Sequence, residues 1–240
     1  MLETPSILDY SPSAIDCFVA RGSENVGVRT ISREVASPPN LAEALTPQRL
    51  HAELLATSAS GAWSHLFGAA HDATINARHK TVRFGQADVE WLAVLRLLLR
   101  ERGQKAWMYR EGKSRRFWVL ETSAKWLVEQ PAASSQEERR AYARGYFDAE
   151  GGIPRDAAAR FYIQFVQKDR ADIANLHGIL EDEGITCGKL HRPSRLADHL
   201  VWRFYVAAPS QRDFVSRVGS WHPRKRSLLE ARFAGFEQPG

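Results

Sequence analysis

The sequence has few of the features that cross-link a chain or place it in a membrane. Cys17 and Cys187 are its only cysteines, and two isolated thiols indicate neither a disulfide framework nor a zinc site. No run of about 18 apolar residues is present, which argues against a transmembrane helix. The opening MLETPSILDYSP lacks the basic and then apolar layout of a signal peptide. These absences favour a cytoplasmic, nucleoid-associated protein.

Positive charge is the main bias in what is present. The chain carries 33 Lys and Arg against 28 Asp and Glu, and its net charge is +5. Ten of the basic residues lie between Lys189 and Arg232, together with only three acidic residues. Because Lys and Arg release condensed counterions from phosphates, a localised surplus of this kind favours a polyanionic partner such as nucleic acid.

The spacing of apolar residues and turn residues predicts the elements of the first half of the chain. Residues 1–58 are interpreted as an N-terminal arm that is partly disordered. They include a short strand at 26–31 and a helix at 48–57. Further elements are then expected in this order: a strand at 81–86, a helix at 88–102 that ends at Gly103, strands at 105–109 and 115–121, and a helix at 124–130.

The same order returns in the second half, which indicates an internal repeat. A helix is expected at 136–150, a strand at 161–166, a helix at 172–183, strands at 189–191 and 202–207, and a helix from 212. Phe84 and Gly103 are 19 positions apart, and so are Phe165 and Gly184. The predicted domains are a first repeat at 59–130, a linker at 131–135, a second repeat at 136–233 and a tail at 234–240.

The predicted fold class follows from this order. Each repeat contains a helix, two strands, a helix, two strands and a helix. Two such αββαββα units would form an α+β fold in which a pseudo-twofold, antiparallel β-saddle carries the helices on its back.

The second repeat opens with a specific motif, Tyr142-Ala-Arg-Gly-Tyr-Phe-Asp-Ala-Glu-Gly-Gly152. It resembles the signature helix of the LAGLIDADG homing endonucleases, because Gly145, Asp148, Ala149 and Glu150 all stand at the family's positions. The resemblance implies that two such helices pack side by side and that small residues let their backbones approach. It also implies that the terminal acid, Glu150, points at the DNA-binding face.

The partner helix in the first repeat is best matched by residues 66–74, in which Gly68 aligns with Gly145. On this alignment His71 falls at the position of Asp148, and Ala73 falls where the acid is required. Asp72 is one position early, which turns a side chain by roughly 100° around a helix. The first catalytic carboxylate is therefore either displaced to Asp72 or absent.

The resemblance implies a set of site residues. Glu150 and Asp72 would be catalytic ligands of Mg²⁺, which prefers oxygen ligands and can activate water at a phosphodiester. Lys225, or Arg224 if the alignment slips, would support water activation, and Lys168, beside Gln167, would lie near the same water network. The residues of the helix interface would be Gly68, Ala69, Gly145, Asp148 and Ala149.

The strands would supply a surface for DNA, since alternate side chains of a strand point to one face. The polar candidates for DNA binding are Arg83, Lys105, Arg110, Arg116, Arg160, Gln164, Lys189, Arg192 and Arg203. The aromatic residues expected in the core instead are Trp107, Phe117, Phe161, Phe165, Trp202 and Phe204.

Three functions are compatible with these residues. The first is a site-specific, Mg²⁺-dependent endonuclease of the homing type that acts on double-stranded DNA as a monomer. The second is a catalytically impaired DNA- or RNA-binding protein on the same fold, such as a splicing helper or regulator, and Ala73 favours it. The third is an α+β interaction domain with an accidental motif.

Overall fold

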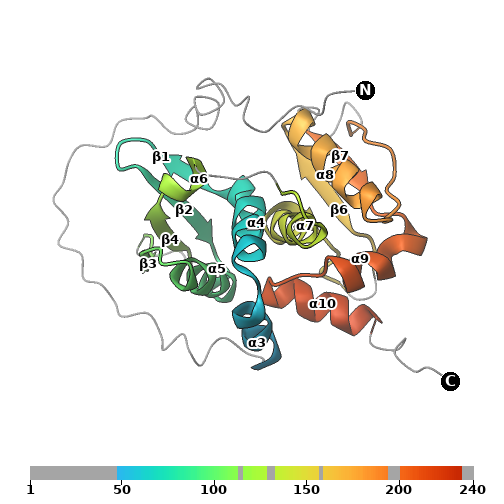
Figure 1. The fold of residues 1–240 in the computed structure, drawn as a ribbon. Helices are drawn as coiled ribbons and strands as arrows, with labels where there is room; N and C mark the ends of the chain where they lie inside the picture. Colours follow the sequence, from blue (N-terminus) through green and yellow to red (C-terminus); the bar gives the residue numbers. More distant parts are fainter. Residues whose placement is uncertain (1–47, 113–115, 129–132, 157–158, 194–200, 234–240) are drawn as a thin grey trace. The chain divides into compact units, whose positions relative to one another are not determined.

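The computed structural model describes residues 48–112, 116–128, 133–156, 159–193 and 201–233 (Figure 1). The strand expected at 26–31, the C-terminal tail and residues 131–132 of the linker lie outside these residues. The described chain divides into two compact bodies. The first body contains residues 73–132, and the second contains residues 47–72 together with residues 133–240. Within the described ranges, no helix has the length and hydropathy needed to cross a membrane.

The first body is an antiparallel sheet with one long helix. Its strands are ordered β1-β2-β4-β3. The elements are β1 (Thr74–Asn76), β2 (Thr81–Gln86), α5 (Val89–Glu101), β3 (Ala106–Arg110), β4 (Trp118–Ser123) and α6 (Lys125–Val128).

The core of the first body follows from the alternation in β2 and the periodicity in α5. Val82 and Phe84 of β2 are buried, and so are Leu92 and Leu95 of α5. Burial of such side chains is the main source of folding free energy. After α5 the chain turns at Gly103, whose φ of 73° is a conformation that glycine adopts without strain.

The second body combines a smaller sheet, ordered β5-β6-β7, with most of the helices. Its elements are α3 (Gln48–Ala56), α4 (Ala59–Ala69), η2 (Ala70–Asp72), α7 (Gln136–Glu150), β5 (Gly151–Gly152), β6 (Gln164–Gln167), α8 (Arg170–Asp182), β7 (Trp202–Tyr205), η3 (Ala208–Ser210), α9 (Gln211–Arg217) and α10 (Pro223–Phe233). Phe147, Phe165, Phe204 and Phe214 are fully buried and form an aromatic core between α7, the sheet and α9.

Helix α7 begins at the predicted residue because its first turn is capped. The Ser135 hydroxyl accepts from the backbone N–H of Glu138, and the Glu138 carboxylate accepts from the backbone N–H of Ser135. This reciprocal arrangement satisfies N–H groups that have no partner within the helix. The same backbone N–H groups, from Ser135 and Ser134, lower the pKa of Glu138 to about 2.

The internal repeat is confirmed by the element boundaries. Helix α5 spans 89–101 and α8 spans 170–182, so both ends are related by an offset of 81, the same offset that separates Phe84 from Phe165. Gly103 and Gly184 are related by the same offset, and their φ angles are 73° and 74°.

Some element predictions were wrong in detail. The strand expected at 161–166 is displaced to 164–167, and β1 and β5 were not predicted. The strand expected at 189–191 is only an isolated bridge between His191 and Arg203. The single helix expected from residue 212 is two helices, α9 and α10, with Gly219 between them at a φ of 63°. This break gives the chain room for the turn 218–222, which carries part of the candidate site.

Candidate active site and nucleic-acid interface

Helices α4 and α7 cross at Gly68 and Gly145. A methyl group added to Gly68 would collide with the backbone of Tyr142 and Tyr146, and one added to Gly145 would collide with the carbonyl oxygen of His65. The two helices therefore approach with their backbones in direct contact, which only glycine permits. Ala69 is also buried in this region, its backbone N adjacent to Gly145, whereas Ala149 is half-buried.

The contacts around the crossing are reciprocal. His65 Nε2 lies 3.8 Å from Asp148 Oδ2, and His71 Nε2 lies 2.8 Å from the Tyr142 hydroxyl oxygen. Residues 65 and 142 are related by an offset of 77, and so are residues 71 and 148. His65 and Tyr142 are therefore equivalent positions of the two copies, and so are His71 and Asp148. Each copy contacts the other through this same pair of positions, as expected for two copies of one motif.

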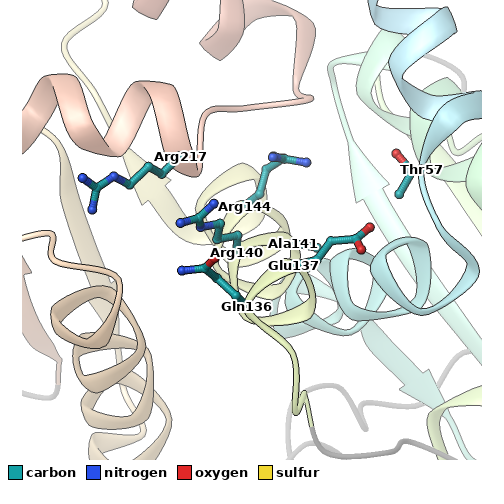
Figure 2. A pocket seen from close by; sticks show the side chains of 7 residues that line it. All are labelled: Thr57, Gln136, Glu137, Arg140, Ala141, Arg144 and Arg217. Atoms are coloured by element: carbon teal, nitrogen blue, oxygen red, sulfur yellow. The ribbon is translucent and has the colours of Figure 1, made fainter.

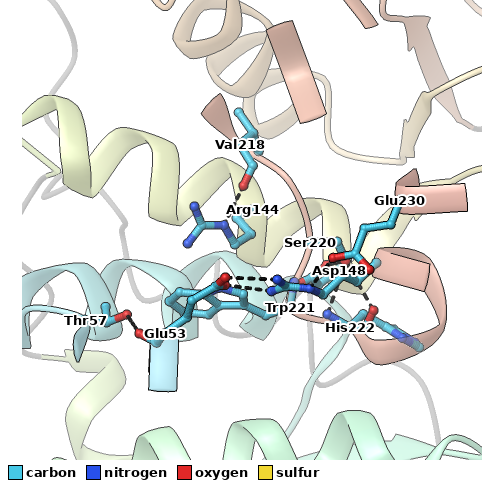
Figure 3. A network of polar contacts seen from close by, with 10 residues as sticks. Glu53, Thr57, Arg144, Asp148, Val218, Ser220, Trp221, His222 and Glu230 are labelled. Atoms are coloured by element: carbon cyan, nitrogen blue, oxygen red, sulfur yellow. Dashed lines mark hydrogen bonds and ion pairs between the residues drawn. The ribbon is translucent and has the colours of Figure 1, made fainter. Parts of the chain in front are cut away.

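Asp148 is fully buried and binds the turn that precedes α10 (Figure 3). Its carboxylate accepts from the Ser220 hydroxyl and from the backbone N–H of Trp221, the latter at 2.9 Å. Burial raises the pKa of Asp148 to about 6, although the Ser220 hydrogen bond and the Lys225 charge both oppose the shift. Asp148 therefore fixes the 218–222 turn to α7.

Lys225 fixes the C-terminal end of α7. Its Nζ donates to the carbonyl oxygens of Phe147, Asp148 and Gly151 at 2.6, 2.9 and 2.7 Å. An ammonium has three donors, so these bonds use all of them. Any effect of Lys225 on a reacting water would therefore act through its charge, and its structural role is to hold the helix end on which Glu150 stands.

Glu150 and Asp72 both act electrostatically on Lys225. Burial and the Arg224 charge lower the pKa of Lys225 to about 8, while Asp148, Glu150 and Asp72 oppose that shift. Glu150 is half-buried at the last position of α7, and Asp72 is exposed at the last position of η2. Helix α4 has tightened into a 3₁₀ turn before Asp72, so the ideal 100° spacing does not describe this end.

His71, which precedes Asp72 in the sequence, occupies an aromatic environment. Its ring lies 4.3 Å from the ring of Tyr146, and its Nδ1 lies 3.6 Å from the Asp172 carboxylate. Burial lowers the pKa of His71 to about 4 despite the attraction of Asp169. Burial also raises the pKa of the Tyr146 hydroxyl, with added contributions from Tyr142, Asp172 and Glu150.

Lys168 is exposed in the turn between β6 and α8, and its backbone N–H donates to the Gln167 side chain at 2.7 Å. Arg224, the alternative to Lys225, is exposed on α10. The structure thus buries Lys225 among the carbonyls of α7 and leaves Lys168 and Arg224 exposed.

Arg83 lies on the face of the first sheet opposite to the buried Val82 and Phe84. In the register of the sheet Arg83 pairs with Glu121, and Glu121 pairs with Trp107. Arg83 Nη2 donates to Glu111 at 2.6 Å and to the Tyr109 hydroxyl at 3.0 Å, so this guanidinium is already partly neutralised.

The other polar residues of the first body are placed differently. Arg110 pairs with Trp118 and, by strand alternation, shares a face with Met108, which is buried. Lys105 lies directly before β3, and Arg116 lies before β4; the side chains of Lys105, Arg110 and Arg116 are exposed.

One aromatic residue was assigned wrongly from the sequence. Trp107 was expected in the core, but it is 42% exposed on the same face as Arg83. The error came from treating aromatic character as sufficient for burial. Phe165 and Phe204 are fully buried, as predicted, whereas Phe117, Phe161 and Trp202 are only half-buried.

The second sheet places Gln164 and Arg203 on one face, opposite to the face of the buried Phe165 and Phe204. Gln164 pairs with Tyr205 across the strands, and Arg203 Nη1 donates to the Tyr205 hydroxyl at 3.3 Å. Arg192 is exposed and stacks over the Trp202 ring at 4.7 Å. The remaining two candidates, Arg160 and Lys189, are exposed.

Comparison with known proteins gives a structural match without a sequence match. Neither family models nor curated proteins match the sequence. Among solved structures, I-DmoI in complex with DNA and Mn aligns with a TM-score of 0.51 and 17% identity over 68% of this chain and 98% of that chain. The N-terminal LAGLIDADG domain of DUF199/WhiA aligns with a TM-score of 0.55 and 14% identity over 72% of this chain and 89% of that chain.

This chain has the LAGLIDADG homing-endonuclease fold. Full-length DUF199/WhiA from Thermotoga maritima gives a TM-score of 0.57 with 15% identity, over 80% of this chain and 67% of that chain. The LAGLIDADG fold is therefore shared with a named homing endonuclease and with DUF199/WhiA, and the low identities limit the likeness to the fold itself.

The acids at the ends of the LAGLIDADG helices fit a hard divalent cation. Glu150 and Asp72 offer carboxylate oxygens, the ligand type that Mg²⁺ prefers. The end of α7 adds the partial negative charge of its carbonyl groups. Three of those carbonyls already accept from Lys225, so the carboxylates are the groups that a cation would neutralise.

A separate cavity of about 350 Å³ lies beside the first half of the LAGLIDADG helix α7 (Figure 2). It is lined by Thr57, Gln136, Glu137, Arg140, Ala141, Arg144 and Arg217. Gln136 and Glu150 stand at opposite ends of α7 and are about 21 Å apart along its axis. The cavity is therefore distinct from the acids. All three of its arginines are already engaged: Arg140 with the Glu183 carboxylate, Arg144 with the carbonyl of Val218, and Arg217 with the carbonyl of Glu183.

Proposed function

We propose that this protein is a site-specific endonuclease of the homing type, which hydrolyses phosphodiester bonds in duplex DNA with Mg²⁺. The observation that carries the proposal is the glycine-mediated pairing of α4 and α7, which leaves Glu150 at the end of α7 and Asp72 at the end of η2. Both carboxylates act electrostatically on the buried ammonium of Lys225. In the structure of I-DmoI, the same fold is seen in complex with DNA and a divalent metal ion.

Each residue has a distinct role in this proposal. Glu150 and Asp72 would hold the metal ion, and Mg²⁺, when bound, would offset negative charge at the scissile phosphate and promote water attack. Lys225 positions Glu150 by holding the carbonyls of α7, and its charge reduces the repulsion between the acids. Asp148 holds the 218–222 turn, from which α10 delivers Lys225.

The polar residues of the strands would hold DNA by contacts to phosphates and base edges. Trp107 joins the candidates, since it is exposed beside Arg83. Because both repeats lie in one chain, the protein would act as a pseudo-symmetric monomer, with repeats at 59–130 and 136–233. Its place in the cell would be the nucleoid, and Lys168 would lie at the edge of the site.

A second function is favoured by Ala73, which occupies the sequence position equivalent to Glu150. If Asp72 does not replace the missing acid, the protein would bind DNA or RNA without cutting it, as a splicing helper or regulator would. Loss of one of two cooperating acids costs orders of magnitude in rate.

A cleavage selection separates the two functions. The wild-type protein is incubated with a randomised duplex library in Mg²⁺, and nicked or cut molecules are recovered and sequenced. In parallel, bound molecules are selected by gel shift without metal. We expect both selections to enrich one sequence. Enrichment by binding alone, with no Mg²⁺-dependent strand breaks, would contradict the nuclease and support the binding protein. If neither selection enriches any sequence, both the nuclease and the DNA-binding protein would be contradicted.

A further inference from the structure

Three potential metal ligands gather in the second body, away from the acids at the helix crossing. They are His177 and Glu181 of α8 and Cys187 in the segment that follows. One ligand atom from each residue lies within 4.8 Å of the others. His177 and Glu181 are four positions apart, so they share one face of the helix. Cys187 is fixed beside them because its backbone forms a bridge with Val206.

Hydrogen bonds already orient two of these side chains. The backbone N–H of Cys187 donates to Glu181 Oε1 at 2.6 Å, which leaves the other carboxylate oxygen as a ligand. His177 Nε2 lies 3.1 Å from the carbonyl oxygen of Gly188. In the tautomer that donates this bond from Nε2, Nδ1 keeps its lone pair and can bind a metal ion. Metal-binding histidines typically donate the N–H of their other ring nitrogen to a backbone carbonyl in this way.

The surroundings hold the cluster in place. The His177 ring packs edge-on against Phe204, with 5.0 Å between ring centroids, and Phe204 itself is fully buried. Cys187 and His177 are half-buried and Glu181 is exposed, so an ion could reach the cluster from solvent. Burial and the Glu181 charge raise the pKa of the Cys187 thiol to about 12. A divalent cation bound between them would offset the repulsion between the Cys187 thiolate and the Glu181 carboxylate.

We propose that His177, Glu181 and Cys187 form a zinc-binding site. One nitrogen, one oxygen and one sulfur ligand suit Zn²⁺, whereas Mg²⁺ prefers oxygen alone. Water would take a fourth position, and the thiol proton would be released on binding. The ion would join α8 to the segment that leads towards β7, so it would fix this part of the second body. This site is independent of the acids proposed for DNA cleavage.

Cobalt is the probe for this site, because Co²⁺ occupies zinc sites and gives a thiolate charge-transfer band. The full-length protein is titrated with Co²⁺ under reducing conditions, and Zn²⁺ is then added. We expect one equivalent of Co²⁺ to give the near-ultraviolet thiolate band and the visible bands of a four-coordinate ion. Zn²⁺ should abolish both, and an equal concentration of Mg²⁺ should leave both unchanged.

Matched variants assign the ligands. Cys187→Ser should remove the thiolate band, while Cys17→Ser should retain it. Glu181→Gln and His177→Gln should each weaken Co²⁺ binding by roughly tenfold or more, and Asp182→Asn, next to Glu181 on α8, should bind like wild type. Circular dichroism checks that each variant is folded. The proposal is overturned if wild type gives no thiolate band, or if the band is lost in Cys17→Ser and kept in Cys187→Ser.

Discussion

Helices α4 and α7 cross at equivalent glycines, but their C-terminal ends are built differently. Helix α7 remains regular through Glu150, and Lys225 holds three carbonyls at its end. Helix α4 ends at Ala69 and tightens into a 3₁₀ turn that reaches Asp72. At the position equivalent to Asp148, which anchors the 218–222 turn, the first helix has His71, which contacts Tyr142 and Asp172.

The difference between the two helix ends shows which part of the motif the fold itself requires. The glycines must stay because backbone atoms occupy the space of a side chain at both positions. The acid end is not under the same steric constraint, so it could diverge in one copy while the helices continued to pack. A retained helix pair therefore indicates the fold, and the acids have to be tested one by one for activity.

The largest effect is expected from substitutions of the two acids, Glu150 and Asp72. Glu150→Gln and Asp72→Asn each remove one carboxylate charge without a large change in volume. If both hold the metal, each should lower single-turnover DNA cleavage by roughly a hundredfold or more while duplex binding persists. The measurement is cleavage rate and binding affinity on the selected site. An Asp72→Asn variant that cuts as fast as wild type would show that only the α7 end is functional.

The crossing glycines should be equally intolerant of substitution. Gly68→Val and Gly145→Val each force a side chain into backbone atoms, and overpacking of this kind should cost about 3 kcal/mol or more of unfolding free energy. Gly178→Ala in α8 is the matched control, because a methyl group there meets nothing within 4 Å. It should stabilise the protein by about 0.5–1 kcal/mol. Urea unfolding measures both, and unequal effects at the two crossing positions would argue against a reciprocal contact.

Removal of the Lys225 ammonium tests whether this side chain stabilises the C-terminal end of α7. Lys225→Met keeps most of the apolar stem but leaves three carbonyls without their donor, so we expect a loss of about 3 kcal/mol. The neighbouring Arg224→Met, at an exposed position, should change stability little. Thermal unfolding provides the comparison. Equal melting temperatures for wild type and Lys225→Met would contradict the capping role.

The turn that carries Lys225 should also make stability depend on pH. Burial, together with the charges of Lys225 and Arg224, lowers the pKa of His222 to about 3. The unfolded chain takes up this proton near pH 6.5, so the stability from neutral His222 is complete above that pH. It is lost as the pH falls from 6.5 towards 3, by up to about 1.4 kcal/mol per pH unit. In His222→Phe, unfolding free energies from pH 7 to 4 should show a shallower decline, and an unchanged slope would refute the assignment.

The smallest effect is expected where the first helix contacts the second. Tyr142→Phe removes the hydroxyl that lies 2.8 Å from His71 Nε2, and one such hydrogen bond contributes about 1 kcal/mol. Chemical denaturation would measure the loss. His71→Phe removes the same hydrogen bond from the other side, so the double variant should lose less than the sum of the two single variants. Strict additivity would show that the bond contributes nothing.

Much of the fold could be predicted because the sequence repeats its own pattern. Helix α7 was predicted at its exact bounds, since its capping residues, its apolar spacing and the glycines after it agree. Strand β2 was predicted equally well because its residues alternate cleanly. The short strands β1 and β5 were missed, since strands of three and two residues have too few positions to show a period.

The site was harder to predict than the fold, because burial and partners depend on distant segments. The sequence indicated Lys225 as a basic residue near the acids, but nothing local showed that its ammonium binds the carbonyls of Phe147 and Gly151. Two isolated cysteines gave no zinc signature. The His177, Glu181 and Cys187 cluster becomes visible only when the segment after α8 folds back on the helix.

The membership of α4 in the second body has a consequence for how the chain can be divided. In sequence α4 directly precedes the first sheet, but its buried face is covered by α7, which follows that sheet. A gene fragment that encodes only the first half would leave the face of α4 that carries His65, Gly68 and Ala69 without its cover and should aggregate. Nascent chains meet the same situation during synthesis, because the last residue of α4 is made 81 residues before the last residue of its partner helix α7. Chaperone dependence is therefore a property to expect of this arrangement.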